Sequence, residues 1–435
     1  MKTKKNRYQI IDSKTPFFYG WIIVLGAFLG SFAGGGMQSF TFGVFLKPMS
    51  EDLGWSRSTI IGALTLRTFV TAAIAPFLGK YVDNKGPQLI MVCSAIAGGI
   101  ACILLTQVTT ILQFYLAFMI VGFAGGAGMG GVVANATVLK WFIKYRGRAT
   151  AFSTMGNTAA GAILAPAVGF VILSSNWRMG WILIAIIFFF LLFPVSTLMV
   201  RKPEDIGLLP DGAQDESELE TNLSKNGKNI TKESWTLNEA LKTSTLWILT
   251  LSMFIGGIGV ASVVVHEFSY ITDLGFSKNI AALILSVHAI TASIGRLVWG
   301  FLVEKIDVKY CMAVLYIGCA IGLGILQTIA MSESTNIFFL FLFAIIYGIC
   351  VGGHIVLSNV AWADYFGSEF IGSIRGFLTP ITIGATALGP IVIGLAYDHM
   401  ESYTLAFNGL LLMFIFGTLV ILLVKSPDKI TRPNK

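Results

Sequence analysis

The sequence predicts an all-α membrane protein with twelve transmembrane helices in two pseudo-symmetric six-helix bundles. Of its 435 residues, 55% are hydrophobic and only 12% are charged, whereas a soluble domain has about 25% charged residues. Long uncharged runs recur along the chain, each able to cross about 30 Å of hydrocarbon. The two halves of the chain also repeat each other. One water-soluble core cannot hide this much apolar surface, so the lipid bilayer is the expected solvent.

The apolar runs define the spans in order. The first is too long for a signal peptide and lacks a clear small-residue cleavage site, so we expect it to be retained as a helix. The spans are residues 19–46, 57–81, 88–107, 112–140, 148–173, 178–200, 243–271, 279–303, 309–330, 335–363, 372–396 and 403–424.

One long polar segment divides the chain six spans plus six. The expected parts are an N-terminal tail (1–18), a six-helix bundle (19–200), a linker loop (201–242), a second bundle (243–424) and a C-terminal tail (425–435). With the N-terminus inside, the cytoplasmic tails and short loops hold 18 Lys and Arg residues against four outside. This asymmetry predicts a multi-pass protein of the cell membrane with both termini cytoplasmic. It also accounts for the basic charge without a nucleic-acid partner.

The halves repeat at a nearly constant offset. At a shift of 221 residues, Leu53-Gly-Trp-Ser-Arg57 falls on Leu274-Gly-Phe-Ser-Lys278, and at 224 residues Asn135 falls on Asn359. Parallel six-helix repeats around a central site are typical of transporters.

Two arginines, Arg67 and Arg296, lie inside apolar spans. A charge at that depth is costly and marks a functional site. A guanidinium suits a carboxylate because its planar fork donates two parallel hydrogen bonds and stays charged. The alternatives are a structural pair for Arg296, and snorkelling or packing for Arg67, whose repeat counterpart is His288.

The candidate proton-binding groups are one acid and three histidines. Glu267 is the acid deep in a span, and His266, His288 and His354 also lie in spans. Burial and neighbouring charges shift such groups towards neutral pH. Adjacent residues on a helix do not share a face, so His266 and Glu267 should act separately. The alternative for each histidine is a hydrogen-bonded core residue.

Uncharged polar side chains complete the candidates. Asn135 and Asn359 need hydrogen-bond partners in hydrocarbon and either bind substrate or tie helices together. Tyr270 and Tyr347 either contact substrate or pack in the core. The five cysteines form no CxxC pair, so we expect neither a metal site nor a cofactor.

The loop Gly79-Lys-Tyr-Val-Asp83-Asn-Lys-Gly86-Pro87 resembles the signature loop of the major facilitator superfamily. Its weaker copy, beginning at Gly300 and Glu304, follows the eighth span. The resemblance implies alternating access, with Gly79, Asp83, Gly300 and Glu304 in gating contacts.

Several further motifs are similar to the monocarboxylate transporters and their oxalate/formate-antiporter-like relatives. They are Tyr19-Gly-Trp21, Lys140-Trp-Phe142 with Arg146-Gly-Arg148, Tyr365-Phe-Gly367, Gly389-Pro390, and Gly295-Arg296. In that group the arginine corresponding to Arg296 pairs with the substrate carboxylate.

The chain departs from this group in its charges. Ala292 stands where animal proton-coupled members have an aspartate, and Gln38 is the polar residue where they have a lysine. The eleventh span carries Arg375 at its end and no lysine. The proton-coupling mechanism of those members therefore cannot be transferred to this chain. One deep cation in the C-terminal half fits a monoanion better than a dianion. Without a neighbouring aspartate, the charge of Arg296 is balanced by the substrate itself, which favours exchange.

The expected protein is a secondary transporter of a small monocarboxylate, lactate- or pyruvate-like, working as a monomer. Its coupling is either to a proton or to a counter-anion. The alternatives are an exporter of another organic anion or a drug, and a non-transporting membrane sensor. An enzyme is not expected, because no nucleophile–base set is evident.

Overall fold

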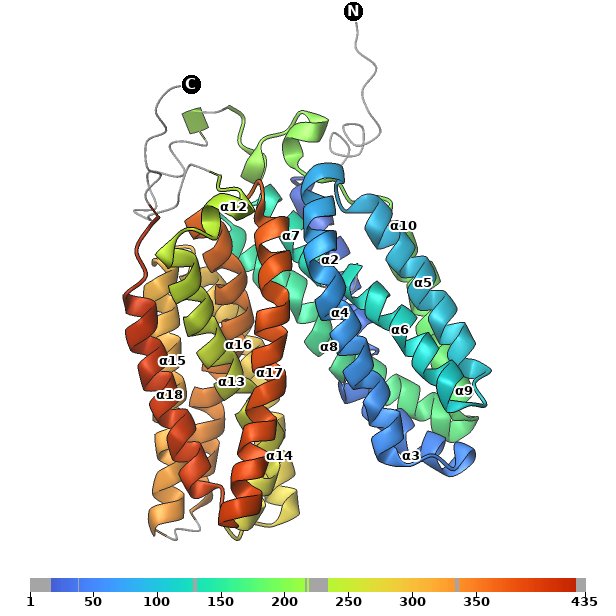
Figure 1. Ribbon diagram of the computed structural model, residues 1–435, viewed down its shortest axis with the longest axis vertical. Helices are drawn as coiled ribbons and strands as arrows, with labels where there is room; N and C mark the ends of the chain where they lie inside the picture. The colour runs from blue at the N-terminus through green and yellow to red at the C-terminus, as the bar shows by residue number, and fades with distance from the viewer. Residues whose placement is uncertain are drawn as a thin grey trace, which may run out of the picture. The chain divides into compact units, whose positions relative to one another are not determined.

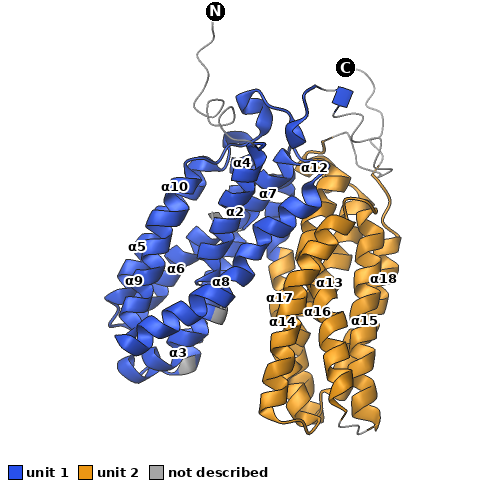
Figure 2. Ribbon diagram, turned by 180° about the vertical axis from the view of Figure 1, so that it is seen from behind, with its two compact units in different colours: residues 1–225, 368–380 blue, residues 226–367, 381–435 orange. Residues whose placement is uncertain are grey.

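Every element longer than a turn in the described part of the chain is a helix (Figure 1). The computed structural model describes residues 17–37, 39–127, 131–215, 217–218, 234–332 and 336–427. The chain divides into two compact units (Figure 2). Unit 1 comprises residues 1–225 with 368–380, and unit 2 comprises residues 226–367 with 381–435.

Unit 1 begins with eight main helices. They are α2 (Gly20–Gly35), α3 (Ser39–Leu53), α4 (Arg57–Lys85), α5 (Gln88–Thr106), α6 (Ile111–Ala127), α7 (Val132–Trp141), α8 (Arg146–Ser174) and α9 (Trp177–Ile187). A π-helical turn, η1 (Phe188–Leu192), joins α9 to α10 (Phe193–Ser196). The short 3₁₀ turns η2 (Pro203–Ile206) and η3 (Pro210–Gly212) follow.

Unit 2 begins with one short helix, α12 (Leu237–Ala240). Its longer helices are α13 (Ser244–Asp273), α14 (Lys278–Leu302), α15 (Val308–Ser332), α16 (Ile337–Phe366) and α18 (Thr404–Leu422). The remaining helix, α17 (Ile371–Met400), is divided, because its residues up to Pro380 group with unit 1.

The internal repeat is visible in how α4 and α14 begin. Ser56 caps α4 by accepting a hydrogen bond from the Thr59 amide, and Ser277 caps α14 in the same way from Ile280. Such caps satisfy an amide that has no partner within the helix. Two residues earlier, Gly54 and Gly275 both have positive φ angles, of 67° and 91°. The same turn therefore starts both helices.

Ten of the twelve predicted spans correspond to helices of the described residues that are long and apolar enough to cross a membrane. The other two, the first and the fourth, need a correction. The span expected over 19–46 is divided into α2 and α3, and the span expected over 112–140 into α6 and α7. Glycines lie at both divisions, and a glycine inside a helix is destabilising by roughly 0.5–1 kcal/mol relative to alanine, so a helix ends more readily in a glycine-rich segment. The repeat counterparts of these spans, α13 and α16, are continuous.

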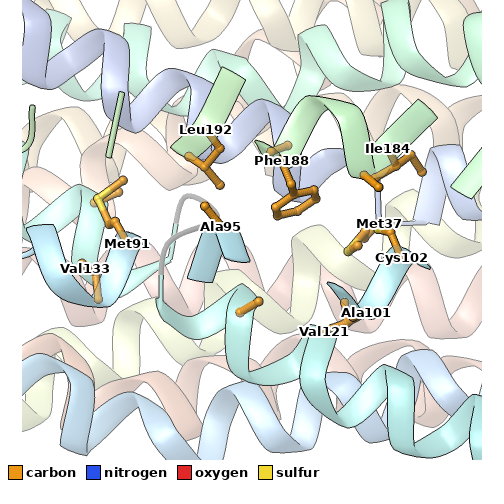
Figure 3. Packing of buried hydrophobic residues seen from close by; sticks show 14 of the residues in the cluster. Met37, Met91, Ala95, Ala101, Cys102, Val121, Val133, Ile184, Phe188 and Leu192 are labelled. Atoms are coloured by element: carbon orange, nitrogen blue, oxygen red, sulfur yellow. The ribbon is translucent and has the colours of Figure 1, made fainter. Parts of the chain in front are cut away.

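The core of unit 1 interleaves small and large side chains (Figure 3). Phe188, Leu192, Met91, Ala95 and Cys102 all belong to this buried cluster. Large apolar side chains also lie on the outside, such as Phe77 at 76% and Leu173 at 89% exposed. An apolar exterior around an equally apolar core is the arrangement that a bilayer requires.

Candidate functional site

Arg296 lies on α14, a helix with three different faces. One face is buried, largely against α16, and consists of Ala281, Ile284, His288, Thr291, Gly295 and Trp299. A second face carries large apolar side chains that are 45–62% exposed, which suits lipid: Leu283, Ile290, Ile294, Val298 and Phe301. The third carries small side chains together with the arginine: Ala282, Ser286, Ala289, Ser293 and Arg296. This small-residue face is neither packed like the first nor apolar like the second, so it is suited to line an aqueous path.

Close helix packing fixes the position of the Arg296 backbone. Gly295 lies directly against the Ile349 carbonyl of α16, and Gly352 against the Ala292 carbonyl of α14. Trp299 Nε1 donates a hydrogen bond of 3.0 Å to the same Ile349 oxygen. Small residues allow helices to approach this closely in a membrane. The arginine therefore projects from a rigid helix pair.

Arg67 projects from α4 towards the last turn of α6. A Cβ placed on Gly125 would lie 3.3 Å from the Arg67 guanidinium and 3.3 Å from Thr71 Oγ1. Thr71 Oγ1 donates to the Gly122 carbonyl oxygen at 2.7 Å, which holds the two helices together. Arg67 Nε is buried and makes no hydrogen bond within the described parts of the chain.

Arg67 and His288 occupy equivalent helix crossings in the two units. A Cβ on Gly122 would lie 2.8 Å from the Arg67 carbonyl oxygen, and a Cβ on Gly348 would lie 2.8 Å from the His288 carbonyl oxygen. The repeat thus places a cation at this crossing in unit 1 and a titratable imidazole at the same crossing in unit 2.

His288 forms a buried pair with Glu267. Glu267 on α13 and His288 on α14 approach to 2.6 Å between Oε2 and Nδ1, and their side chains are 1% and 7% exposed. Glu267 Oε1 is buried and has no hydrogen-bond partner among the described residues. Tyr347 on α16 places its ring edge-on to His288, with centroids 5.5 Å apart. Sequence reasoning named all three residues but did not pair them, because hydropathy does not show which faces of the consecutive helices α13 and α14 meet.

His266 lies on another face of α13 from Glu267. Its Nε2 donates to the Pro390 carbonyl oxygen at 2.9 Å, and its Nδ1 lies 3.2 Å from the Tyr403 hydroxyl. The carbonyl accepts only, so Nε2 carries the proton and a neutral ring accepts from Tyr403 at Nδ1. Both ring nitrogens are satisfied, which fits a structural role.

The remaining polar candidates are distributed over both units. Tyr270 donates to Gln327 Oε1 at 3.0 Å and packs on Phe407. His354 on α16 lies beside the Tyr316 ring, with centroids 6.2 Å apart. Asn135 and Asn359 are each 6% exposed, on α7 and α16 respectively. The contacts of Tyr270 and His354 given above involve neither Glu267 nor His288.

Asp83, at the end of α4, binds the N-terminus of α17. Its carboxylate accepts hydrogen bonds from the Gly372 amide (3.1 Å), the Ser373 amide (2.6 Å) and the Ser373 hydroxyl (2.7 Å). Lys140 Nζ completes the site at 2.7 Å. Unsatisfied amides and the helix dipole make a helix N-terminus favourable for an anion. Sequence reasoning named Asp83 but missed Lys140, whose repeat position holds an acid, Asp364.

Gly79 permits this contact, because its Cα faces the Gly372 carbonyl and a side chain there would meet that oxygen. The corresponding residues of the second motif, Gly300 and Glu304, are also buried, at the end of α14 and in the turn that follows it. Glu304 is 8% exposed.

Asp211 attaches the start of the linker to the connection between α7 and α8. Its carboxylate accepts from the amides of Ile143 (3.0 Å), Lys144 (2.8 Å) and Tyr145 (3.2 Å). Burial raises the pKa of Asp211, and the three amide hydrogen bonds oppose that rise. The sequence predicts only a polar linker here, and no motif in it indicates the contact between Asp211 and the α7–α8 connection.

Two repeated units of membrane-spanning helices, with a buried arginine and a buried histidine at matching helix crossings, define a multi-pass membrane carrier. The chain belongs to the major facilitator superfamily. The family model described as "Major Facilitator Superfamily" matches its residues 27–277 and 246–435. It is therefore a secondary transporter of a small solute and not an enzyme, as the sequence predicted.

Individual relatives are distant but cover most of the chain. The chain is 22% identical to the oxalate:formate antiporter of Oxalobacter formigenes, over 84% of this chain and 82% of that protein. It is 23% identical to monocarboxylate transporter 2 of Rattus norvegicus, over 88% and 78%. The fold is similar to that of a proton:xylose symporter, with a TM-score of 0.68 and 13% identity over 94% of this chain and 95% of that one.

Proposed function

We propose that the protein transports a small monocarboxylate, lactate- or pyruvate-like, across the cell membrane by alternating access. Both termini are cytoplasmic in this proposal, and the anion moves either with a proton or in exchange for another anion. The observation that carries it is Arg296 on the small-residue face of α14. The names of two relatives, an oxalate:formate antiporter and a monocarboxylate transporter, support the same class of substrate.

Arg296 is the carboxylate-binding residue in this proposal. Its charge is independent of pH, and its fork matches the two oxygens of one carboxylate. The rigid α14–α16 contact holds the backbone in place, so little freedom is lost when the anion binds. Ser293, about one turn before Arg296 on the same face, leaves room for an α-hydroxy or α-oxo group beside the carboxylate.

Counterflow in proteoliposomes tests the proposal. Vesicles preloaded with one of a panel of unlabelled monocarboxylates should take up the labelled anion, and Arg296→Lys should reduce this uptake at least tenfold at equal protein abundance. Arg178→Lys is the matched control, since Arg178 is an exposed arginine paired with Asp52. Normal uptake by Arg296→Lys would contradict the assignment. Arg296-independent binding of neutral compounds would favour a drug exporter, and binding without flux would favour a sensor.

A further inference from the structure

Among the described residues of unit 2, the most deeply buried acid is Glu267, and its hydrogen-bond partner is an imidazole. Glu267 Oε2 and His288 Nδ1 lie 2.6 Å apart, and the side chains are 1% and 7% exposed. The other carboxylate oxygen, Oε1, has no hydrogen-bond partner among the described residues. A purely structural ion pair normally satisfies both oxygens, because a buried acceptor without a partner is costly. An acceptor left open in this way is available to a proton.

The elements around the pair bring one further titratable group to it. α16 presents Tyr347, whose ring faces His288 and whose hydroxyl is buried without a hydrogen bond in the described parts of the chain. α18 carries no ionisable side chain between Thr404 and Leu422. α17 touches α13 at Gly389 and Pro390, and its unit 2 part bears its ionisable residues only at the far end, as Tyr397, Asp398 and His399.

The charges on the pair's own helices lie further along them. On α13, Asp273 follows Glu267 by six residues, and His266 points to Pro390 and Tyr403. On α14, Lys278 precedes His288 by ten residues and Arg296 follows it by eight. Eight residues of helix correspond to roughly 12 Å. Arg296 is therefore the fixed charge most able to influence the pair from within the span.

We propose that Glu267 and His288 form the proton-binding site of this carrier, coupled to anion binding at Arg296. The inference rests on the proposed function, because the anion is the co-transported species. With Oε1 unprotonated and the Nδ1–H of a neutral His288 donating to Oε2, Glu267 carries one negative charge and balances Arg296. A bound monoanion neutralises Arg296 and leaves Glu267 in excess. One proton taken up at the open Oε1, with the Nδ1–H hydrogen bond kept, restores neutrality, so one anion and one proton cross together.

Electrostatic linkage gives the size of the effect. Two charges roughly 12 Å apart at an effective dielectric of about 20 change each other's binding about tenfold. The anion therefore raises the proton affinity of the pair about tenfold, and the proton raises the anion affinity by the same factor. In this proposal Glu267 supplies a negative charge within the span, so the carrier works by symport and not by the exchange that the sequence favoured.

The transport test separates coupling from binding. Wild-type proteoliposomes should accumulate the anion in response to an inward proton gradient, and Glu267→Gln should lose this accumulation at least tenfold while keeping counterflow. Glu51→Gln is the matched control, since Glu51 is an exposed acid on α3 whose side chain is 67% exposed. Accumulation by Glu267→Gln equal to wild type would overturn the proposal, as would wild-type exchange with no accompanying proton movement.

A second measurement needs no substrate and so separates this inference from the proposed function. Infrared difference spectra of the purified protein on acidification should contain a protonated-carboxyl component that is missing in Glu267→Gln and retained in Glu51→Gln. Its absence in wild type would overturn the proton site even if counterflow is normal. Its presence would support the site even if no monocarboxylate is transported. Loss of counterflow in both Glu267→Gln and His288→Asn at normal abundance would mark the pair as structural and overturn the proposal.

Discussion

The Asp83 carboxylate holds Ser373 by two hydrogen bonds at once, at 2.6 Å from the amide and 2.7 Å from the hydroxyl. With the Gly372 amide and Lys140, these contacts satisfy a nearly completely buried carboxylate. We propose that this attachment of α4 to the start of α17 is made and released during transport. Its residues lie 290 positions apart in the chain.

Asp83→Asn should slow transport at least tenfold and destabilise the protein. The change leaves Lys140 buried without its counter-ion, and losing one partner of a buried pair costs about 3–5 kcal/mol. Thermal unfolding and initial uptake rates measure the two effects. The double change Asp83→Asn with Lys140→Met should recover part of the stability but not the transport rate. If the two single changes simply add, the pair is not coupled.

Gly79→Ala should destabilise unit 1 by about 1–3 kcal/mol, because the new methyl group meets the Gly372 carbonyl and overpacked contacts cost that amount. Gly43→Ala on α3 is the matched control, since nothing lies within 4 Å of a Cβ there. That control should raise stability by about 0.5–1 kcal/mol through lower chain entropy. Equal melting temperatures for the two variants would contradict the close contact at Gly79.

Arg67→Met should abolish transport without lowering stability. A buried guanidinium whose Nε makes no hydrogen bond within the described residues costs free energy, and an apolar side chain of similar length removes that cost. The melting temperature should therefore stay level or rise, while counterflow falls at least tenfold. A clear fall in melting temperature would instead show that Arg67 stabilises the α4–α6 crossing, and would argue against a substrate or gating role.

Stability should rise on mild acidification through Asp211. Its pKa is raised by burial in the folded protein, whereas in the unfolded chain it is near the ordinary value of about 3.9. The folded state then binds the proton more tightly, so this contribution is complete below the unfolded pKa and is lost as pH rises through the folded one. Asp211→Asn should reduce the difference in melting temperature between pH 4 and pH 7 by comparison with wild type. An unchanged difference would exclude Asp211 as its source.

The sequence predicted the helices better than the contacts between them. Apolar length alone located the twelve spans, and the shift of 221 residues matched the turn at Ser56 to that at Ser277. The divisions between α2 and α3 and between α6 and α7 escaped prediction. The glycines and alanines there are apolar, so they do not interrupt the hydropathy of the span even where the helix ends. Pairing escaped for the same kind of reason, since hydropathy says nothing about which helix Glu267 faces.

The candidate site shows where this limit lies. Arg296, Glu267 and His288 each stood out alone, because ionisable groups are rare in hydrocarbon. Lys140 did not stand out, because it lies at a helix end among other basic residues. The repeat does not single it out either, since its counterpart is an acid, Asp364. Ser373 carries no unusual chemistry at all and acquires its role from the carboxylate that meets it.

The three faces of α14 also limit how this segment can evolve. Substitutions change one face at a time, whereas inserting or deleting a single residue rotates everything beyond it by about 100°. An insertion between His288 and Arg296 would turn the arginine away from the small-residue face and bring the Leu283 and Ile290 stripe out of register with the Val298 stripe. Homologous carriers should therefore differ freely in the composition of this helix but hardly ever in the spacing between these two residues.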